Sequence, residues 1–345
     1  KGKGIEMKKK LILMMIGAMT VGVLLTGCGK KEEMPVQETM VEQEEAFTFT
    51  DDLGREITVN NPQRVAALLG SYADIWYLAG GEVHACADDA WDDFNLPMPE
   101  DAVNLGMTKD LNLEKLFGAD PDLVLASVNT RQNMEWLDLF EESGINAAYF
   151  DVSDFDDYLR VLEICTKITD REDLYEQNGL AIQQKIEDVK AASQARIAEE
   201  GKAPTALVIR ASASIICAKN STGNVLGEMV AGVGCVNIAD SNDSLLETLS
   251  MEYIIEQDPE YIFFTQHGDD KEKVEANIQN FITENPAWSE LTAVKEGRVY
   301  MMEKDLYTLK PNDRWGEAYE KLEATKVSKD ELYFSQLTDV YKNVE

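Results

Sequence analysis

Histidine, basic residues and familiar catalytic motifs are all scarce in this sequence. Its 345 residues include 2 His, and 32 Lys plus Arg against 64 Asp plus Glu, so the formal net charge is −32. A surface this acidic is repelled by nucleic acid and anionic lipid headgroups, which excludes nucleic acid as a partner. Two His are too few for a histidine-rich site for bare manganese or zinc ions.

Motifs that would indicate an enzyme are also missing. The sequence contains no glycine-rich phosphate loop, no GxSxG and no HExxH, and no pair of carboxylates stands apart from a solvated acidic face. The 5 Cys, at positions 28, 86, 165, 217 and 235, form no CxxC and have no His at metal-site spacing. We therefore expect no catalysis, no disulfide framework and no zinc site, and interpret the last four Cys as small buried hydrophobic residues.

One long apolar run is present, at residues 11–27, and it contains no charge. Three lysines at 8–10 precede it, and Leu-Thr-Gly-Cys at 25–28 closes it, as in a signal peptide with a small-residue cleavage site. At about 17 residues the run is shorter than the roughly 20 that span a bilayer. We predict that 1–27 is a signal peptide, with 1–6 upstream of the natural initiator; the alternative is an ordinary apolar anchor that ends in Cys.

The tetrad at 25–28 resembles a bacterial lipobox, which implies that Cys28 becomes a lipidated N-terminus. Residues 28–46 are acidic, with only scattered apolar side chains, so they are predicted to form a flexible tether. The expected location is the outer face of the cell membrane, with the lipid anchor as the only attachment.

The body of the chain contains an internal repeat. Residues 111–127 align without a gap on residues 249–265, and each copy predicts a helix, an Asp-Pro turn and a buried strand. A Val-Asn pair precedes each copy, at 103–104 and 236–237, and a helix ending in glycine precedes each pair. The repeat predicts two lobes of the same build.

Strands that alternate with helices indicate an α/β fold with mostly parallel sheets. The first lobe is predicted at 47–168 and the second at 201–345. Between them, Thr169 or Asp170 is expected to cap one long rigid helix that ends before Gly201 and spans 169–200. Ligands of such sheets bind beyond the carboxyl ends of the strands, and often between domains. The fold therefore predicts a ligand cleft between the lobes.

Several motifs together resemble the ABC-importer substrate-binding proteins for ferric siderophores, haem and cobalamin. They are DDLGRE at 51–56, PQRV at 62–65, NLE at 112–114, DPDLV at 120–124 and the stretch from PAW at 286–288 to AVKEGRVY at 293–300. The resemblance covers roughly residues 47–326. It implies a bilobal protein that binds its ligand in the cleft and delivers it to a membrane permease with its ATPase.

Side chains that follow the predicted strands are the candidates for ligand contact. An exposed Trp in the polar loop DDAWDDF favours a ligand platform over packing, and an Arg can bind a carboxylate or catecholate through two hydrogen bonds or instead pair with a local Asp or Glu. The ligand-binding candidates are Tyr72, Trp91, Asn129, Arg131, Arg210, Ser212, His267, Tyr307, Lys310 and Arg314.

His267 can also ligate iron if the ligand is haem. The haem-receptor branch of the family is similar here, with a His-Gly after the same strand and a Met in the first-lobe loop. Met107 lies in that loop, two positions before the family's Met, where this chain has Lys109. The alternative is that His267 is a solvated loop residue.

Glu114 and Glu252 occupy equivalent positions in the repeat. The resemblance implies that one glutamate per lobe, at this position, forms salt bridges with arginines of the permease. A carboxylate in the first turn of a helix is also favourable by itself, by about 0.3–1 kcal/mol.

The sequence and this resemblance together imply a monomeric importer lipoprotein with no cofactor of its own, since the iron arrives within the ligand. A ferric siderophore is the leading ligand, followed by haem and then cobalamin. A surface adhesin or sensor lipoprotein with the same fold is the alternative function.

Overall fold

The computed structural model describes residues 46–268 and 270–327. The predicted signal peptide, the lipidation site Cys28 and nearly all of the tether lie outside the described residues. In the described part of the chain, no helix has the length and apolar character needed to cross a membrane.

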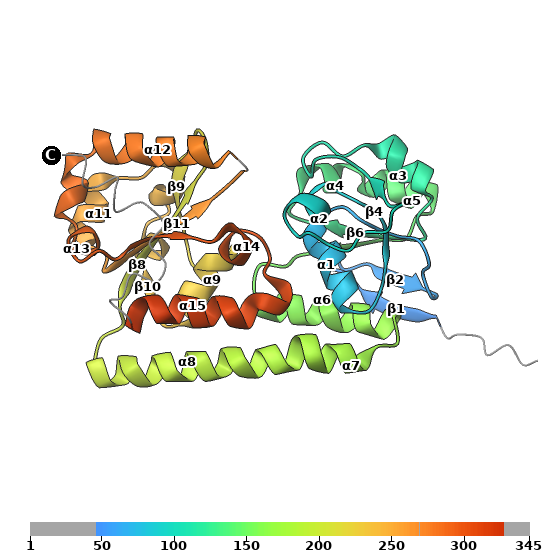
Figure 1. Cartoon of the computed structure of the whole chain (residues 1–345), viewed down its shortest axis with the longest axis horizontal. Helices are drawn as coiled ribbons and strands as arrows, with labels where there is room; N and C mark the ends of the chain where they lie inside the picture. Colours follow the sequence, from blue (N-terminus) through green and yellow to red (C-terminus); the bar gives the residue numbers. More distant parts are fainter. Residues whose placement is uncertain (1–45, 269, 328–345) are drawn as a thin grey trace, which may run out of the picture. The chain divides into compact units, whose positions relative to one another are not determined.

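The first lobe is built on a parallel five-stranded sheet in the order β5-β4-β3-β6-β7 (Figure 1). An antiparallel hairpin, which the sequence analysis did not predict, precedes it. The elements of this lobe are β1 (Phe47–Thr50), β2 (Glu56–Val59), β3 (Val65–Ala67), α1 (Gly70–Leu78), β4 (Val83–Cys86), α2 (Asp89–Asp92), β5 (Val103–Asn104), α3 (Leu113–Ala119), β6 (Leu123–Ser127), α4 (Arg131–Glu135), α5 (Leu137–Ser143), β7 (Ala147–Phe150) and α6 (Phe155–Ile168).

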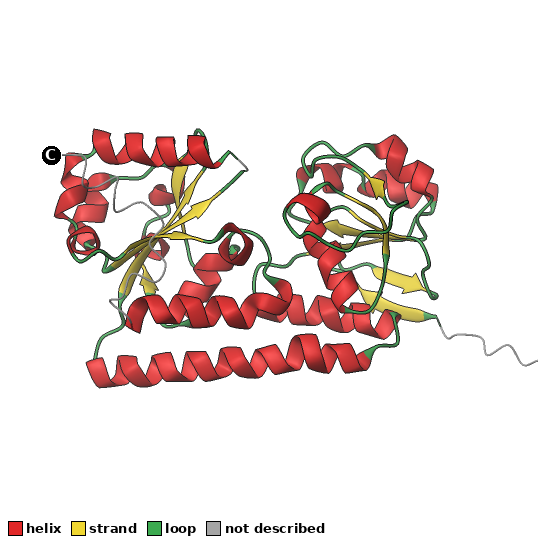
Figure 2. Ribbon diagram, viewed as in Figure 1, coloured by secondary structure: helices red, strands yellow, loops and turns green. Residues whose placement is uncertain are grey.

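The second lobe has a sheet in the order β10-β8-β11-β12, all parallel, with β9 antiparallel to β8. Figure 2 shows helices on both sides of each sheet, as the α/β prediction requires. The elements are β8 (Thr205–Ala211), β9 (Ile216–Lys219), α9 (Val225–Gly232), β10 (Val236–Asn237), η2 (Ile238–Ser241), α10 (Ser244–Glu247), α11 (Met251–Gln257), β11 (Tyr261–Gln266), α12 (Lys271–Glu284), η3 (Pro286–Glu290), α13 (Thr292–Lys295), β12 (Val299–Met302), α14 (Lys304–Tyr307), η4 (Asn312–Arg314) and α15 (Trp315–Val327).

The internal repeat has the same backbone in both lobes. Helix α3 and strand β6 of the first lobe correspond to α11 and β11 of the second. Each helix ends in a left-handed aspartate before proline, Asp120 with φ 50° and Asp258 with φ 41°. The two Val-Asn pairs form the short edge strands β5 and β10. The duplication predicted from sequence is therefore present at the level of single backbone turns.

A helix of three successive parts links the lobes: α7 (Glu172–Tyr175), a π-helical turn η1 (Glu176–Leu180) and α8 (Ala181–Glu200). The predicted cap was wrong by one or two residues. Thr169 instead ends α6, where its hydroxyl donates to Ala79 O at 2.6 Å, and Arg171 precedes the first turn of α7. Asp170 between them has φ 56°. The π-helical turn contains Gly179, where a Cβ would lie 2.7 Å from Leu159 of α6.

Buried apolar residues of both lobes form one continuous core. Tyr72 and Phe150 of the first lobe belong to the same cluster as Phe263 and Trp315 of the second. The ring of Phe155 on α6 meets the ring of Trp315 on α15 at a centroid distance of 6.3 Å. Helix α15 also packs along α8 (Figure 1). Two further clusters fill the other face of each sheet.

Candidate ligand-binding site

In the first lobe, the segments after β3 and β4 pack tightly against each other at the carboxyl ends of these strands. Gly70 N donates to Asp89 Oδ1 at 2.8 Å, and a Cβ on Gly70 would lie 2.8 Å from Ala90 N. Only glycine fits here without displacing backbone. Burial raises the pKa of Asp89 to about 6, the largest effect, while the hydrogen bond from Gly70 lowers it.

Tyr72 and Trp91 are less accessible than the sequence analysis expected. Tyr72 is buried, and its hydroxyl donates to Phe150 O at 2.7 Å. Trp91 lies in the short helix α2 and is half-buried against the shared core, so the expectation of an exposed indole was wrong. Asp92 and Asp93, which follow it, are exposed while the ring packs inward, and the polar composition of the loop does not reveal this difference.

Several candidate side chains are engaged by neighbours. Asn129 Nδ2 donates to Asp151 Oδ1 at 2.6 Å. Arg131, almost fully exposed, pairs with Glu135 at 2.7 Å, which is the local-partner alternative left open by the sequence. Ser212 Oγ accepts from Ile215 N at 3.0 Å and so shapes the turn between β8 and β9.

Two of the C-terminal candidates are also engaged by neighbouring residues. Tyr307 is buried, with its hydroxyl donating to Ala318 O at 3.0 Å. Arg314 binds Asp305 and Glu317 and is held by both carboxylates. Because Arg314 and Lys321 both donate to Glu317, the pKa of Glu317 falls to about 2.

Lys310 has a different environment. Its Nζ lies 5.5 Å from the centre of the Tyr72 ring, and no carboxylate of the described residues is within ion-pair distance. Burial lowers its pKa, although the charges of Asp151 and Asp89 act in the opposite direction. The side chain is half-buried by surface area. The ammonium group of Lys310 is therefore partly removed from water and makes a cation–π contact with the Tyr72 ring.

Arg210 and Lys219 form a second cationic position, on the second lobe. Ala206 and Val208 of β8 belong to the shared core, so by strand alternation Arg210 projects from the same face. Lys219 of β9 lies opposite Val208 in the antiparallel register, and opposed residues share a face. Both side chains are half-buried.

These two cations have no ion pair with any carboxylate that the structure describes. Burial lowers the pKa of Lys219, and the positive charge of Arg210 lowers it further. Elsewhere cations of this acidic chain are commonly paired, as Lys202 is with Glu260 at 2.6 Å. Two like charges held together without a counter-ion can accommodate an anion. Sequence reasoning missed Lys219, although a short apolar run after a serine-rich turn is a hairpin signal.

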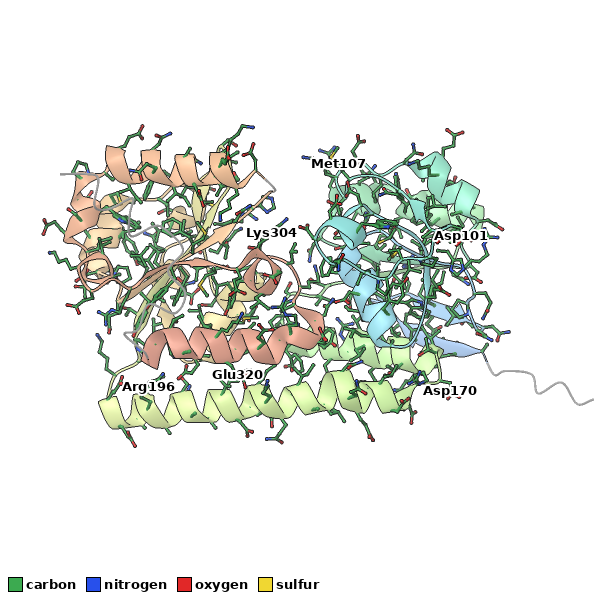
Figure 3. All side chains as sticks on the ribbon, in the orientation of Figure 1. Asp101, Met107, Asp170, Arg196, Lys304 and Glu320 are labelled. Carbon is green, nitrogen blue, oxygen red and sulfur yellow. The ribbon has the colours of Figure 1, made fainter. Side chains whose placement is uncertain are left out.

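The segment after β12 also bridges the lobes. Lys304 Nζ pairs with Asp93 of the first lobe at 2.7 Å. Asn312 Nδ2 donates to Asp74 Oδ2 at 2.7 Å and to Ser71 O at 2.9 Å, both on α1. Figure 3 labels Lys304 on the second lobe. Sequence reasoning missed these contacts because their partners are more than 200 positions apart.

His267 and Met107 are both exposed. His267 directly follows β11, and its backbone N donates to Ala211 O at 2.8 Å. Met107 is 49% exposed in the loop between β5 and α3, and Figure 3 labels it on the first lobe. Each lobe thus presents one potential iron ligand near the carboxyl end of its sheet.

The candidate docking residues also keep their repeat symmetry. Glu114 on α3 and Glu252 on α11 are exposed in the first turns of equivalent helices. Neither carboxylate has an ion pair with a residue in the described ranges.

Comparisons with known proteins agree with this architecture. Residues 65–306 match the periplasmic binding protein family, and the chain belongs to that family of transport proteins, as the sequence motifs implied. The chain is 22% identical over 302 residues to the Fe(3+)-citrate-binding protein YfmC of Bacillus subtilis, covering 87% of this chain and 91% of that protein.

Two further similarities come from a lipoprotein and a solved structure. The chain is 23% identical over 319 residues to YhfQ of Bacillus subtilis, a putative ABC transporter substrate-binding lipoprotein, covering 88% of this chain and 93% of that one. The structure of Staphylococcus aureus IsdE complexed with heme matches with a TM-score of 0.64 at 15% identity, covering 76% of this chain and 98% of that one. At that identity the structural match shows the fold alone. The family match, together with these similarities, makes the chain an ABC transporter substrate-binding protein of the iron, siderophore, haem and cobalamin class.

Proposed function

We propose that this protein captures an anionic ferric complex, a ferric siderophore with carboxylate or catecholate oxygens, and delivers it to an ABC permease and its ATPase. The observation that carries this proposal is that Arg210 and Lys219 lie close together without an ion pair to any described carboxylate, in a chain of net charge −32. YfmC, which is named for binding Fe(3+)-citrate, supports the same ligand chemistry.

The cations that would contact the ligand all belong to the second lobe, and one of them lies against the first. Arg210 can bind one carboxylate or catecholate through two hydrogen bonds, and Lys219 can contact a neighbouring oxygen. Lys310, beside Tyr72, would supply a third positive charge near the first lobe. Anion binding would also offset the repulsion between Arg210 and Lys219 and raise the pKa of Lys219 towards its usual value.

The test is titration of the purified protein with iron(III) citrate and an iron(III) tricatecholate, alongside haemin and cyanocobalamin, by native mass spectrometry and calorimetry. Arg210→Gln and Lys219→Gln should each weaken binding of the ferric chelates by roughly 10–100-fold, since a hydrogen bond to a charged group contributes about 1.5–3 kcal/mol. Lys202→Gln is the matched control, because Lys202 precedes the opposite end of β8 and is 70% exposed. Its affinity should stay within about twofold of wild type. Unchanged affinity in both Arg210→Gln and Lys219→Gln would refute the proposed contacts.

Haem is the second candidate, because His267 and Met107 are exposed on different lobes. On this alternative, haemin produces a Soret shift that His267→Ala weakens. Absence of any spectral change with haemin would eliminate it.

The remaining parts of the proposal concern the membrane. Glu114 and Glu252 would dock the two lobes on the permease, and Cys28 would carry the lipid that holds the protein at the outer face of the membrane. Labelling of the full chain with a radioactive fatty acid, lost in Cys28→Ser, tests the anchor.

A further inference from the structure

The repeat places an exposed apolar residue beside each docking glutamate. Phe117 is 37% exposed on α3, three positions after Glu114, and Ile255 is 40% exposed on α11, three positions after Glu252. Residues three apart on a helix are neighbours on its surface. We call Glu114 with Phe117, and Glu252 with Ile255, the two docking patches.

The two patches share their buried neighbour, their helix cap and the turn that follows. The residue just before each apolar side chain, Leu116 or Ile254, is fully buried, so each helix turns its opposite side to the core. Both helices then end in the same left-handed Asp-Pro turn and continue into a strand that is buried throughout in β6 and as far as Thr265 in β11. The first turn of each helix is capped by a polar side chain, Asn112 or Ser250.

A single exposed apolar side chain on a surface needs no explanation. Here, however, two of the six large apolar side chains that are exposed in the described residues fall at one position of the repeat. Exposing apolar surface to water costs free energy at both sites, and a polar side chain at either exposed position would avoid that cost. If both patches bind the same kind of surface on a partner, the exposure of Phe117 and Ile255 at equivalent positions is explained.

The charge of the patches limits what can cover them. Their carboxylates would repel a second copy of this chain docked patch to patch, and also an anionic lipid surface. A complementary partner carries positive side chains beside an apolar recess. Because the lobes present the same surface twice, the partner must present its own surface twice, as two equivalent or homologous halves do.

Resting on the proposed function, we infer that Phe117 and Ile255 are apolar anchors, each inserted into an equivalent recess of the two halves of the ABC permease, beside the cationic side chains that bind Glu114 and Glu252. Burying the exposed part of each side chain would strengthen docking by roughly tenfold. The anchors lie on different lobes, so their effects should multiply, to about a hundredfold in the double variant.

The first experiment is photo-crosslinking of the full-length lipoprotein in the cells that produce it. A photoreactive phenylalanine derivative is placed at position 117, 255 or 180; Leu180 is 41% exposed on the linking helix and serves as the control. We expect positions 117 and 255 to crosslink to permease chains, in corresponding segments of the two halves, and position 180 not to do so. Crosslinks to another copy of this protein, to non-corresponding segments, or no more than at position 180 would overturn the inference.

The second experiment measures binding of the ligand-loaded protein to the permease–ATPase complex in nanodiscs. Phe117→Ser and Ile255→Ser should each weaken binding about tenfold, while Leu180→Ser does not, and all three should keep wild-type affinity for the ferric chelate. Glu114→Lys with Glu252→Lys provides the reference for lost docking. If the double glutamate variant abolishes binding but Phe117→Ser and Ile255→Ser bind as Leu180→Ser does, the inference about apolar anchors is refuted. Docking through the glutamates would still be supported. If wild type itself does not bind the complex, the proposed function fails.

Discussion

Asp74 is a buried carboxylate that joins the lobes, and its ionisation should limit the stability of the protein at neutral pH. Its Oδ2 accepts from Nδ2 of the fully buried Asn312 at 2.7 Å. Burial raises the pKa of Asp74 from 3.8 to about 6; the hydrogen bond from Asn312 opposes this shift, and the charge of Asp313 adds to it.

The sign of the effect follows from linkage. A carboxyl group whose pKa is higher in the folded than in the unfolded state binds its proton more tightly when folded, so folding loses free energy as pH rises between the two values. The cost is absent below about pH 4 and complete above about pH 6. A shift from 3.8 to about 6 corresponds to ~3 kcal/mol at most, because part of the side chain remains accessible.

Asp74→Asn removes the charge and keeps an oxygen that can accept from Asn312. We expect the variant to be more stable than wild type by ~2–3 kcal/mol at pH 7 and equal to it near pH 4. Urea unfolding followed by tryptophan fluorescence between pH 4 and 7.5 measures this difference directly. Because Asp89 also has a pKa of about 6, only the difference between variant and wild type isolates Asp74.

The control is Asp138→Asn, which removes an exposed carboxylate from α5. It should leave the free energy of unfolding within about 0.5 kcal/mol of wild type at each pH. A stability gap for Asp74→Asn that stays constant across this pH range, or a variant less stable than wild type at pH 7, would show that the Asp74 charge is not penalised as argued.

Two further predictions concern packing and docking. Gly70→Ala should lower the free energy of unfolding by ~1–3 kcal/mol, because the new Cβ meets backbone at 2.8 Å, whereas Gly118→Ala, with open space around it, should raise it by ~0.5–1 kcal/mol; thermal unfolding compares the two. Charge reversal in Glu114→Lys with Glu252→Lys should abolish uptake of the ferric chelate by cells while leaving its affinity for the purified protein unchanged. A parallel loss of affinity would place these glutamates in the pocket or the fold instead.

Local patterns in the sequence predicted the repeated elements well. The Asp-Pro turns and the buried strands that follow them depend on neighbouring residues, and the structure has both where the pattern placed them. The predicted cap of the linking helix was one or two residues early. Two local ion pairs were also predictable from the sequence, because Arg131 with Glu135 and Arg314 with Glu317 have helical spacing. That spacing was a reason to expect both arginines to pair with a neighbouring glutamate and not with the ligand.

Features that depend on distant parts of the chain were not predictable in this way. Trp91 is half-buried because the shared core lies beneath α2, and Asn312 is buried because α1 lies against it. Strand β9 was missed, so Lys219 could not be placed beside Arg210. The hairpin of β1 and β2 was missed too, although Phe47–Thr50 and Glu56–Val59 alternate apolar and polar residues as strands do.

The apolar core that runs through both lobes has a consequence for how the duplicated chain responds to damage. Two lobes with separate cores would melt as two units, and a cavity in one would leave the other intact. Here Phe155 and Trp315 bury each other across the lobes, so a defect in either lobe reduces the stability of both. Calorimetry should therefore record one unfolding transition, and neither half of the duplication should survive as a folded fragment by itself.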